Sequence, residues 1–597
     1  MKYLKKISFL LSKRERWHAI LLLVMTLIMA LIETLGVASI LPFVAILSNP
    51  QIVETNNVLS IVYQTLKNFG IETEQEFFIL MGFFVFFLLI FSIIFKALTI
   101  YFQIRFIKKC EHNIGVRLIK GYLYQSYSWF LNRNSSILGK TILSEVSNVV
   151  SKGLMPLMSL ITNFFIIISL FILLIVAEPK LTSIAIFTIC SFYGLIYMLN
   201  LNLLKKIAKA VFEANEGMYK ISSEAFGAFK EIKLSGLEEI YIDQFYRPSK
   251  IIAQNSGLWQ VLNQVPRFTL EAVVFGGMLL IILFFMTVTG DISKVLPIIA
   301  LYSFAGYRLM PALQKIYISF SSLSYVLPSL DSIYDDVKNL KLKPYQTYKD
   351  KLELNKNICL KNIYFSYPNA SKSALKNVNL NIPAFKTIGL VGVTGSGKTT
   401  TIDIILGLLE AQKGTLEVDG RVINTHNKRA WQCSIGYVPQ QIFLSDNTIS
   451  ANIAFGVNAN DINQQEVEDA AKIANLHEFV KTELPLKYQT IIGERGVRLS
   501  GGQRQRIGIA RALYHKPKVL VLDEATSALD NLTEKVVMDG INDSQHRITK
   551  ILVAHRLSTV KNCDIIYLFD KGEVKHEGNY QELLKKSESF RLSVENS

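Results

Sequence analysis

The stretch Gly392–Thr400, "GVTGSGKTT", decides the fold of the second half of this 597-residue chain. It follows the apolar run "TIGLV" and precedes "TIDIILGLL", giving the strand, loop and helix order that a phosphate-binding loop requires. Its glycines let backbone N–H groups face phosphate oxygens, and the dipole of the following helix favours negative charge. We therefore predict a nucleoside triphosphate site, with Lys398 on the β- and γ-phosphates and the Thr399 hydroxyl on Mg²⁺. The predicted phosphate-binding residues are Gly392, Val393, Thr394, Gly395, Ser396, Gly397, Lys398, Thr399 and Thr400.

A second motif, "KVLVLDEATSALD", ends an apolar strand in two acids. Val519–Leu522 has the pattern of a buried parallel strand, so Asp523 and Glu524 are expected at the carboxyl edge of a sheet, where ligands bind in α/β folds. Asp523 would hold Mg²⁺ through water, and Glu524 would polarise the attacking water. Together with the phosphate loop, this pair predicts hydrolysis of the nucleotide.

A third motif, "LSGGQRQRIGIARAL", begins at Leu499 and opens a predicted helix. The Ser500 hydroxyl and the amides of Gly501 and Gly502 would form a second anion cradle at the helix N-terminus, next to Gln503. This motif resembles the signature sequence of ATP-binding cassette proteins. The resemblance implies that the nucleotide is ATP and that two cassettes, head to tail, enclose two ATP molecules. Because the chain carries one cassette, it also implies a homodimer or a pair with a sister subunit.

Four further positions match the pattern of that family. The resemblance implies that Tyr367 in "FSYP" stacks on adenine and that Gln440 in "GYVPQ" senses Mg²⁺ and the γ-phosphate. It also implies a dimer contact for Asp530 in "SALD" and a γ-phosphate contact for His555 in "VAHRLS". Since Glu524 and His555 are both present, each of two identical sites would hydrolyse ATP, which argues against an ATP-gated channel or regulator.

The first half of the chain has the composition of a membrane protein. Half of all residues are hydrophobic and the mean hydropathy is +0.29, which is rare for a soluble enzyme of this size. About 20 helical residues cross a hydrocarbon core, and six apolar runs are long enough. These predicted spans are residues 18–47, 77–106, 153–177, 181–204, 268–290 and 295–323. They exclude the soluble cassette proteins of repair and translation.

The net charge of +16 is explained by membrane topology rather than by a nucleic-acid partner. Lysines and arginines gather before the first span and after the second and fourth, whereas Lys67, Lys180 and Lys294 are the only basic residues of the alternating loops. By the positive-inside rule, both termini and the cassette are cytoplasmic. We expect a multi-pass protein of the bacterial inner membrane. The five cysteines show no spacing typical of disulfides or zinc.

These patterns divide the chain into a six-helix transmembrane domain (1–325), a linker (326–353) and an α/β cassette domain (354–597). The loops after the second and fourth spans keep helical periodicity, so we expect those helices to continue well into the cytoplasm. The external segment 56–70 has an apolar stripe that predicts a short helix, either on the outer leaflet or packed on neighbouring helices. The whole chain resembles a half-transporter of the exporter class.

Ionisable residues within spans indicate the substrate, because they are costly in a membrane and usually functional. Arg308 has no local partner in the sequence and would suit a phosphate or pyrophosphate, while Arg267 either lines the same cavity or pairs with Glu271 four residues on. The stretches "IET…PF" around Glu33, "VPR…LE" and "YRLMP" resemble the lipid-linked oligosaccharide flippases of bacterial protein N-glycosylation. That resemblance implies a polyprenyl-pyrophosphate glycan as substrate. Hydrophobic drugs, lipid A-like lipids and peptides stay open as alternatives.

Overall fold

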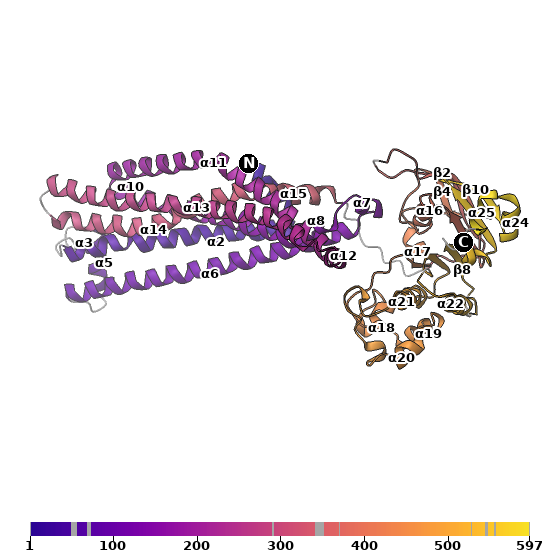
Figure 1. Cartoon of the computed structure of the whole chain (residues 1–597). Coiled ribbons are helices and arrows are strands. Elements are labelled where there is room, and N and C mark those ends of the chain that lie inside the picture. Colours follow the sequence, from indigo (N-terminus) through magenta and orange to yellow (C-terminus); the bar gives the residue numbers. More distant parts are fainter. Residues whose placement is uncertain are drawn as a thin grey trace. The chain divides into compact units, whose positions relative to one another are not determined.

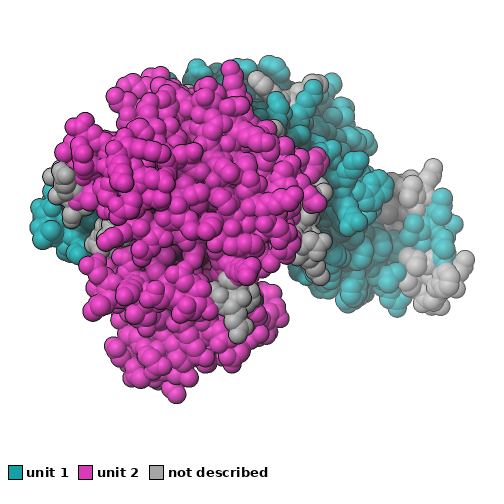
Figure 2. Space-filling model, turned by 90° about the vertical axis from the view of Figure 1, so that its right-hand side faces the viewer, with its two compact units in different colours: residues 1–125, 133–343 teal, residues 126–132, 344–597 magenta. Residues whose placement is uncertain are grey.

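The computed structural model describes residues 2–48, 57–67, 73–288, 292–340, 351–368, 370–526, 528–543, 547–554 and 557–595. The chain forms two compact units, coloured separately in Figure 2. Unit 1 comprises Met1–Gln125 and Arg133–Lys343, and unit 2 comprises Pro344–Ser597 together with the short segment Ser126–Asn132. That segment lies between two long helices of unit 1, yet its contacts assign it to unit 2.

Unit 1 is helical, and its long helices lie side by side in Figure 1. Its helices are α1 (Lys2–Leu10), α2 (Lys13–Ala38), α3 (Ile40–Ser48), α5 (Asn57–Lys67), α6 (Glu74–Leu123), α8 (Ser135–Lys140), α9 (Val146–Val149), α10 (Met155–Ala177), α11 (Pro179–Gly227), α12 (Phe229–Ser235), α13 (Glu238–Val288), α14 (Ile292–Tyr325) and α15 (Leu327–Asn339). Two π-helical turns, η1 (Thr141–Glu145) and η2 (Val150–Leu154), join α8, α9 and α10 into one rod.

Local sequence signals explain where these helices start. Ser12 and Glu15 form a capping box at the start of α2, and Thr73 and Glu76 form another at the start of α6. Because α6 has 50 residues, it is about 75 Å long, far more than a bilayer core requires. The prediction that the spans continue as helices beyond the membrane is therefore confirmed for α6.

Four helical segments among the described residues are long and apolar enough to cross a membrane: Lys13–Leu47, Gln75–Leu123, Ser135–Ala177 and Pro179–Gly227. They contain the first four predicted spans, and the fifth and sixth fall on α13 and α14. A buried cluster that includes Met29, Leu170 and Leu301 joins α2, α10 and α14. Large apolar side chains of α6, such as Phe87, stay exposed, which suits a surface facing lipid.

The structure shows helices in two predicted segments, the external segment 56–70 and the linker 326–353. A helix, α5, occupies most of the external segment 56–70, and its Tyr63 packs edge-on against Phe77 with ring centroids 5.1 Å apart. The neighbouring Ile61 is 63% exposed, so α5 packs through one side only. Helix α15 occupies the first half of the predicted linker and buries Leu330 and Ile333 in unit 1.

Unit 2 contains two sheets. Its strands are β1 (Asn357–Phe365), β2 (Leu375–Pro383), β3 (Thr387–Gly392), β4 (Lys413–Val418), β5 (Arg421–Val422), β6 (Ile435–Val438), β7 (Val519–Asp523), β8 (Thr549–Val553), β9 (Ile565–Asp570) and β10 (Glu573–Gly578). One sheet has the order β10-β9-β3-β8-β7-β6 and is parallel except for β10. The other, β2-β1-β4-β5, is antiparallel.

The helices of unit 2 lie before, between and after its strands in the chain. They are α7 (Tyr127–Leu131), α16 (Lys398–Ile405), α17 (Lys428–Gln432), α18 (Ile449–Ile453), α19 (Gln464–Ile473), α20 (His477–Thr482), α21 (Gly501–Tyr514), α22 (Asn531–Asp543), α23 (Leu557–Val560), α24 (Tyr580–Lys586) and α25 (Glu588–Glu595), with short 3₁₀ turns at Ala459–Asp461, Lys487–Gln489 and Glu494–Gly496.

The sheet order brings the two nucleotide motifs together. Strands β3 and β7 both pair in parallel with β8, so the loop after Gly392 and the acids after Leu522 leave the sheet at the same edge. All five residues of β7 are buried, as the apolar run predicts. The interior also holds Trp431, whose indole N–H donates to the carbonyl of Ile405 at 2.7 Å.

Candidate functional site

The phosphate loop folds around two glycines that no other residue could replace without strain. Gly392 has φ +152°, and a Cβ there would lie 2.3 Å from the carbonyl oxygen of Phe569. Gly397 has φ +105° and immediately precedes α16. The buried Lys398 crosses the loop, and its Nζ donates to the carbonyls of Gly392 at 2.6 Å and Val393 at 3.0 Å. Burial lowers the pKa of Lys398, while Glu524 and Asp523 act in the opposite direction.

A pocket of about 500 Å³ opens beside this loop. It is lined by Tyr367, Ala374, Thr394, Gly395, Gly397, Lys398, Thr399, Thr400, Gln440 and Glu524. The structure thus brings nine of the predicted nucleotide residues together around one cavity: six from the phosphate loop, together with Tyr367, Gln440 and Glu524. A cavity of this size suits a nucleotide.

Glu524 directly follows the carboxyl end of β7 and has an unusual backbone conformation. Its φ of +50° is rare for a residue with a side chain, and such strain clusters at functional sites. The Gln440 amide donates to the Glu524 carboxylate at 2.7 Å. The predicted water-polarising residue and the predicted γ-phosphate sensor are therefore in direct contact.

Asp523 is buried one residue earlier and is close to two residues that the sequence analysis did not single out. The hydroxyl of Tyr437, on the neighbouring strand β6, donates to Asp523 Oδ2 at 3.5 Å. Burial and the nearby Asp523 raise the pKa of Asp403, on α16, to about 6. Burial, together with Asp523, also raises the pKa of Tyr437.

Three of the predicted residues carry oxygen atoms that suit a magnesium ion arriving with a nucleotide, and two of them, Thr399 and Gln440, line the pocket. The Thr399 hydroxyl, the Gln440 amide and the Asp523 carboxylate are the hard oxygen donors that Mg²⁺ prefers. Among the described residues, no three His, Cys, Asp or Glu side chains could hold a metal by themselves. Phosphate oxygens and water would therefore have to complete the coordination, as they usually do for Mg²⁺.

Of the other predicted residues, one lines the pocket and the others that the structure describes do not. Tyr367 borders the pocket, and its hydroxyl is 3.1 Å from the Thr400 hydroxyl. Ser500, Gly501, Gly502 and Gln503 do not line the pocket; they form the start of α21, where Ser500 and Gln503 make a capping box. Asp530 caps α22 by accepting the Leu532 and Thr533 amides at 3.1 and 2.9 Å. His555 lies outside the described residues.

A second group of charges lies in unit 1, within the predicted spans. Glu33, on α2, is 3% exposed, and its Oε1 accepts Lys96 Nζ of α6 at 2.9 Å and Arg308 Nη1 of α14 at 2.6 Å. Lys315, two turns after Arg308, is within electrostatic range of Glu33 and Lys96. Glu33 Oε2 is buried and has no hydrogen-bond partner among the described residues. We call these four residues the span cluster.

The span cluster corrects one interpretation of the sequence. Arg308 is not unpaired, because helix packing brings it to Glu33, 275 positions earlier in the chain. Arg267 lies outside the cluster and pairs with Glu271 at 2.8 Å, one of the two alternatives left open by their spacing. Lys96 and Lys315 were not predicted, although a lysine inside an apolar run was a visible signal for each.

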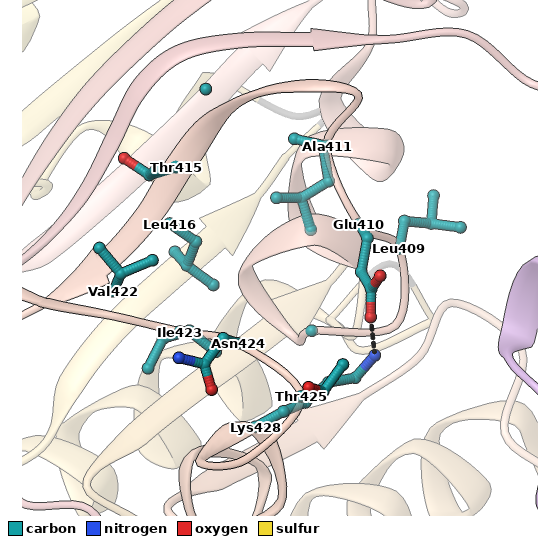
Figure 3. A pocket seen from close by; sticks show the side chains of 13 residues that line it. Leu409, Glu410, Ala411, Thr415, Leu416, Val422, Ile423, Asn424, Thr425 and Lys428 are labelled. Carbon is teal, nitrogen blue, oxygen red and sulfur yellow. Dashed lines mark hydrogen bonds and ion pairs between the residues drawn. The ribbon is translucent and has the colours of Figure 1, made fainter.

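A further recess lies at the other end of α16, away from the phosphate loop (Figure 3). It has a volume of about 280 Å³ and is lined mainly by Leu409–Ala411 and by residues of β4, β5 and the loop after β5. Lys428 and Glu410 pair across it at 3.3 Å. Its one lysine is thus already neutralised, and the recess shares no residue with the predicted nucleotide pocket.

Comparison with known proteins gives matches over both units. The family model described as "ABC transporter transmembrane region" matches residues 19–311, and the model described as "ABC transporter" matches residues 375–527. An ATP-dependent lipid A-core flippase from Saccharophagus degradans is 31% identical over 80% of this chain and 80% of its own length. The heterocyst differentiation ATP-binding protein HepA from a Nostoc species is 30% identical over 82% of this chain and 80% of its own length.

Among solved structures, a bacterial Atm1-family ABC exporter with ATP bound has the same fold, with a TM-score of 0.78. The match covers 97% of this chain and 98% of the exporter at 20% sequence identity. It therefore extends over the helical unit and the cassette unit alike.

Proposed function

The chain belongs to the ABC transporter family and is an exporter that couples ATP hydrolysis to transport across a membrane; from this premise we propose that it flips a polyprenyl-pyrophosphate oligosaccharide to the outer leaflet of a bacterial inner membrane. One observation carries the proposal: the span cluster sets Lys96, Arg308 and Lys315 against the single carboxylate of Glu33. Cations in excess within a membrane need an anion, and a pyrophosphate supplies one.

The chemistry of the cluster favours a phosphate over a carboxylate or a neutral lipid. Glu33 holds Arg308 and Lys96 through one oxygen, so each cation has donors left for a ligand. Arginine binds phosphate through two parallel hydrogen bonds, and lysine adds a point charge. In a medium of low dielectric constant these interactions are stronger than in water. The stretches around Glu33, Arg267 and Arg308 also resemble those of the oligosaccharide flippases.

ATP hydrolysis would take place between two copies of the chain, each of which supplies one half of each site. Lys398 and the loop amides would hold the phosphates, Ser500 of the partner subunit would close over the γ-phosphate, and Tyr367 would stack on adenine. Glu524, oriented by Gln440, would polarise the attacking water. Mg²⁺, held through Thr399 and Asp523, would supply positive charge where phosphate charge develops.

The position of the signature residues supports a dimer. In one chain, Ser500 starts α21 and does not line the pocket that contains Lys398. A second copy, or a sister subunit with the same motifs, would bring the two halves together. The basic loops support a topology with both termini and the cassette in the cytoplasm.

The test measures ATP-dependent loss of a polyprenyl-pyrophosphate oligosaccharide from the cassette-exposed leaflet of proteoliposomes. Arg308→Gln and Lys96→Gln should each reduce flipping by at least about tenfold, because each removes a charge-assisted contact of about 1.5 to 3 kcal/mol. Glu524→Gln should stop both flipping and ATP hydrolysis. The matched control is Arg247→Gln, which removes an exposed arginine paired with Asp243 outside the predicted spans.

Three lipids distinguish the alternatives: the pyrophosphate glycolipid, a phosphorylated lipid A and a neutral glycolipid. Flipping of the pyrophosphate lipid alone supports the proposal. Preference for lipid A would keep the span cluster as a phosphate site but replace the substrate. Equal flipping of the neutral lipid, or normal flipping by Arg308→Gln, would contradict a role for the cluster in headgroup recognition.

A further inference from the structure

The carboxylate of Glu33 holds two cations, from two other helices, through a single oxygen atom. Its Oε1 accepts Lys96 Nζ at 2.9 Å and Arg308 Nη1 at 2.6 Å. Its Oε2 is buried and has no hydrogen-bond partner among the described residues. Lysine has three N–H donors and arginine five, and each uses one of them on Glu33. The three side chains are therefore held together, but neither the cations nor the carboxylate are saturated.

These three side chains differ in how open they are. The Glu33 side chain is 3% exposed, whereas that of Arg308 is 20% and that of Lys96 is 32% exposed. Met29 and Val37, about one turn before and after Glu33 on α2, are 2% and 1% exposed and belong to the packed cluster of α2, α10 and α14. The carboxylate is therefore fixed in the packed interior, while the two long cationic side chains keep surface that a ligand can reach.

A second buried carboxylate of unit 1 shows the opposite arrangement. Glu145, at the end of the π-helical turn η1, has a side chain that is 1% exposed, and its partner Lys140, at 3.4 Å, is 2% exposed. Asn215 also donates to Glu145, at 3.3 Å. Both charges of that pair are closed to a ligand, which is typical of a pair that only stabilises helix packing. The open cations set the pairs of Glu33 apart from it.

An anion that binds Lys96 and Arg308 competes with Glu33 for both cations. Two anions beside one cation repel each other, and the repulsion is stronger at a low dielectric constant than in water. A phosphate that pairs with Arg308 therefore weakens the hold of Glu33, and Glu33 in turn weakens the hold of the phosphate. The free Oε2 allows the carboxylate to keep one cation through both oxygens while the other cation turns to the ligand.

We propose that Glu33 is a positioning residue that holds the two cations between transport cycles and competes for them while a headgroup is bound, so that the headgroup can leave at the outer leaflet. The inference rests on the proposed function, because it requires an anionic headgroup at Lys96 and Arg308. A site without this competing carboxylate would bind the headgroup more tightly and release it more slowly.

The test compares wild type with Glu33→Gln and Glu33→Asp in proteoliposomes, with a fluorescent polyprenyl-pyrophosphate oligosaccharide at increasing mole fraction. Glu33→Gln should lower the half-saturating mole fraction by about tenfold, which is what the weaker charge-assisted hydrogen bonds are worth. Its maximal flipping rate should fall by about the same factor, because affinity changes lie mostly in the dissociation rate. Glu33→Asp keeps the charge but shortens its reach, so both quantities should shift in the same direction by smaller factors.

The matched control is Glu145→Gln, which also removes a buried carboxylate from a lysine of unit 1. It should leave the half-saturating mole fraction unchanged, although it lowers stability. A further comparison uses the Arg308→Gln background. There, Glu33→Gln should change the affinity less than it does in the wild type, because one of the two cations for which Glu33 competes is missing. Thermal unfolding in detergent checks that each variant is folded, and Glu33→Asp supplies the result if Glu33→Gln does not fold.

The inference and the proposed function fail in different ways. Unchanged or weaker binding of the pyrophosphate lipid by the folded Glu33 variants, with normal flipping by the wild type, would overturn the inference alone. Glu33 would then only hold the two cations in place. If the wild type flips a neutral glycolipid of the same chain length equally well, or flips neither lipid, the proposed function is contradicted and the inference falls with it.

Discussion

The phosphate loop of unit 2 and the span cluster of unit 1 both hold cations for an anion, but they hold them in different ways. Lys398 donates to two carbonyls of its own loop, so residues within six positions of each other form the whole arrangement. Arg308 and Lys96 depend on one carboxylate from a third helix, Glu33. The first site is fixed by local backbone geometry, whereas the second is fixed by helix packing.

This difference determines whether the geometry of each site depends on the relative positions of helices. A loop that binds phosphate through its own amides works in any protein that folds the strand and the helix around it. A cluster assembled from three helices changes whenever those helices move relative to one another, which is what a transport cycle requires of a substrate site. Under the proposed function, cations held by oxygen atoms would bind an unchanging ligand, the nucleotide, in unit 2 and the transported lipid in unit 1.

The largest effect should follow from removing the cation of the phosphate loop. Lys398→Ala should lower ATP hydrolysis by at least about 100-fold, because a preorganised charge at the transferring phosphoryl group is lost. Phosphate release from proteoliposomes measures this directly. Lys361→Ala, which removes an exposed lysine paired with Glu417, should leave the rate unchanged. Substantial hydrolysis by Lys398→Ala would remove this lysine from the site.

A second effect concerns stability and distinguishes the two ways of holding a cation. Glu33→Gln should destabilise the protein by about 3 kcal/mol, because it removes a buried carboxylate and leaves the half-buried Lys96 and Arg308 without their shared partner. Arg308→Gln should cost less, since Glu33 keeps Lys96. The double variant Glu33→Gln/Arg308→Gln should be more stable than Glu33→Gln. Thermal unfolding in detergent gives the order, and a less stable double variant would contradict it.

A smaller effect tests whether Ser500 acts as a helix cap or as a ligand. Ser500→Ala should cost about 1 kcal/mol in stability through the lost cap of α21, whereas Ser500→Gly should cost only a few tenths. If the hydroxyl also contacts ATP across a dimer, both variants should lose hydrolysis to a similar degree. Normal hydrolysis by the glycine variant would leave Ser500 with capping alone.

The smallest effect is a pH dependence away from both sites. Asp419 joins the start of the cassette to the turn after β4 by accepting the amides of Asn355, Lys356 and Asn357. Burial alone would raise the pKa of Asp419, but these three amides lower it below its usual value. The folded state therefore binds the proton more weakly, and the stabilisation is present above about pH 4 and lost as the pH falls through the lowered value.

Asp419→Asn should accordingly lower the melting temperature by the same amount at pH 7.5 and pH 5. The difference from wild type should shrink below pH 4, where the wild-type carboxylate becomes protonated. A difference that already disappears between pH 7.5 and pH 5 would contradict the lowered pKa of this carboxyl group.

Sequence alone predicted the helical exporter domain with its fused cassette, and the fold match confirms both. Apolar runs of sufficient length left helices as the only solution in a membrane. The sequence also predicted most residues of the nucleotide pocket, because each motif fixes its local backbone geometry within a few residues. Asp403 and Tyr437 were missed, since neither belongs to a motif and only the packing of α16 and β6 against β7 brings them to Asp523.

What the sequence determined by itself is therefore the set of features that lie within short stretches: the phosphate loop, the two acids at the end of β7, the signature at α21 and the spans. The tertiary structure alone decided that Arg308 pairs with Glu33 and that Lys96 and Lys315 join them. The physical reason is one of distance along the chain. Hydrogen bonds and dihedral preferences act over a few residues, whereas the faces on which distant helices meet depend on how all their side chains pack together.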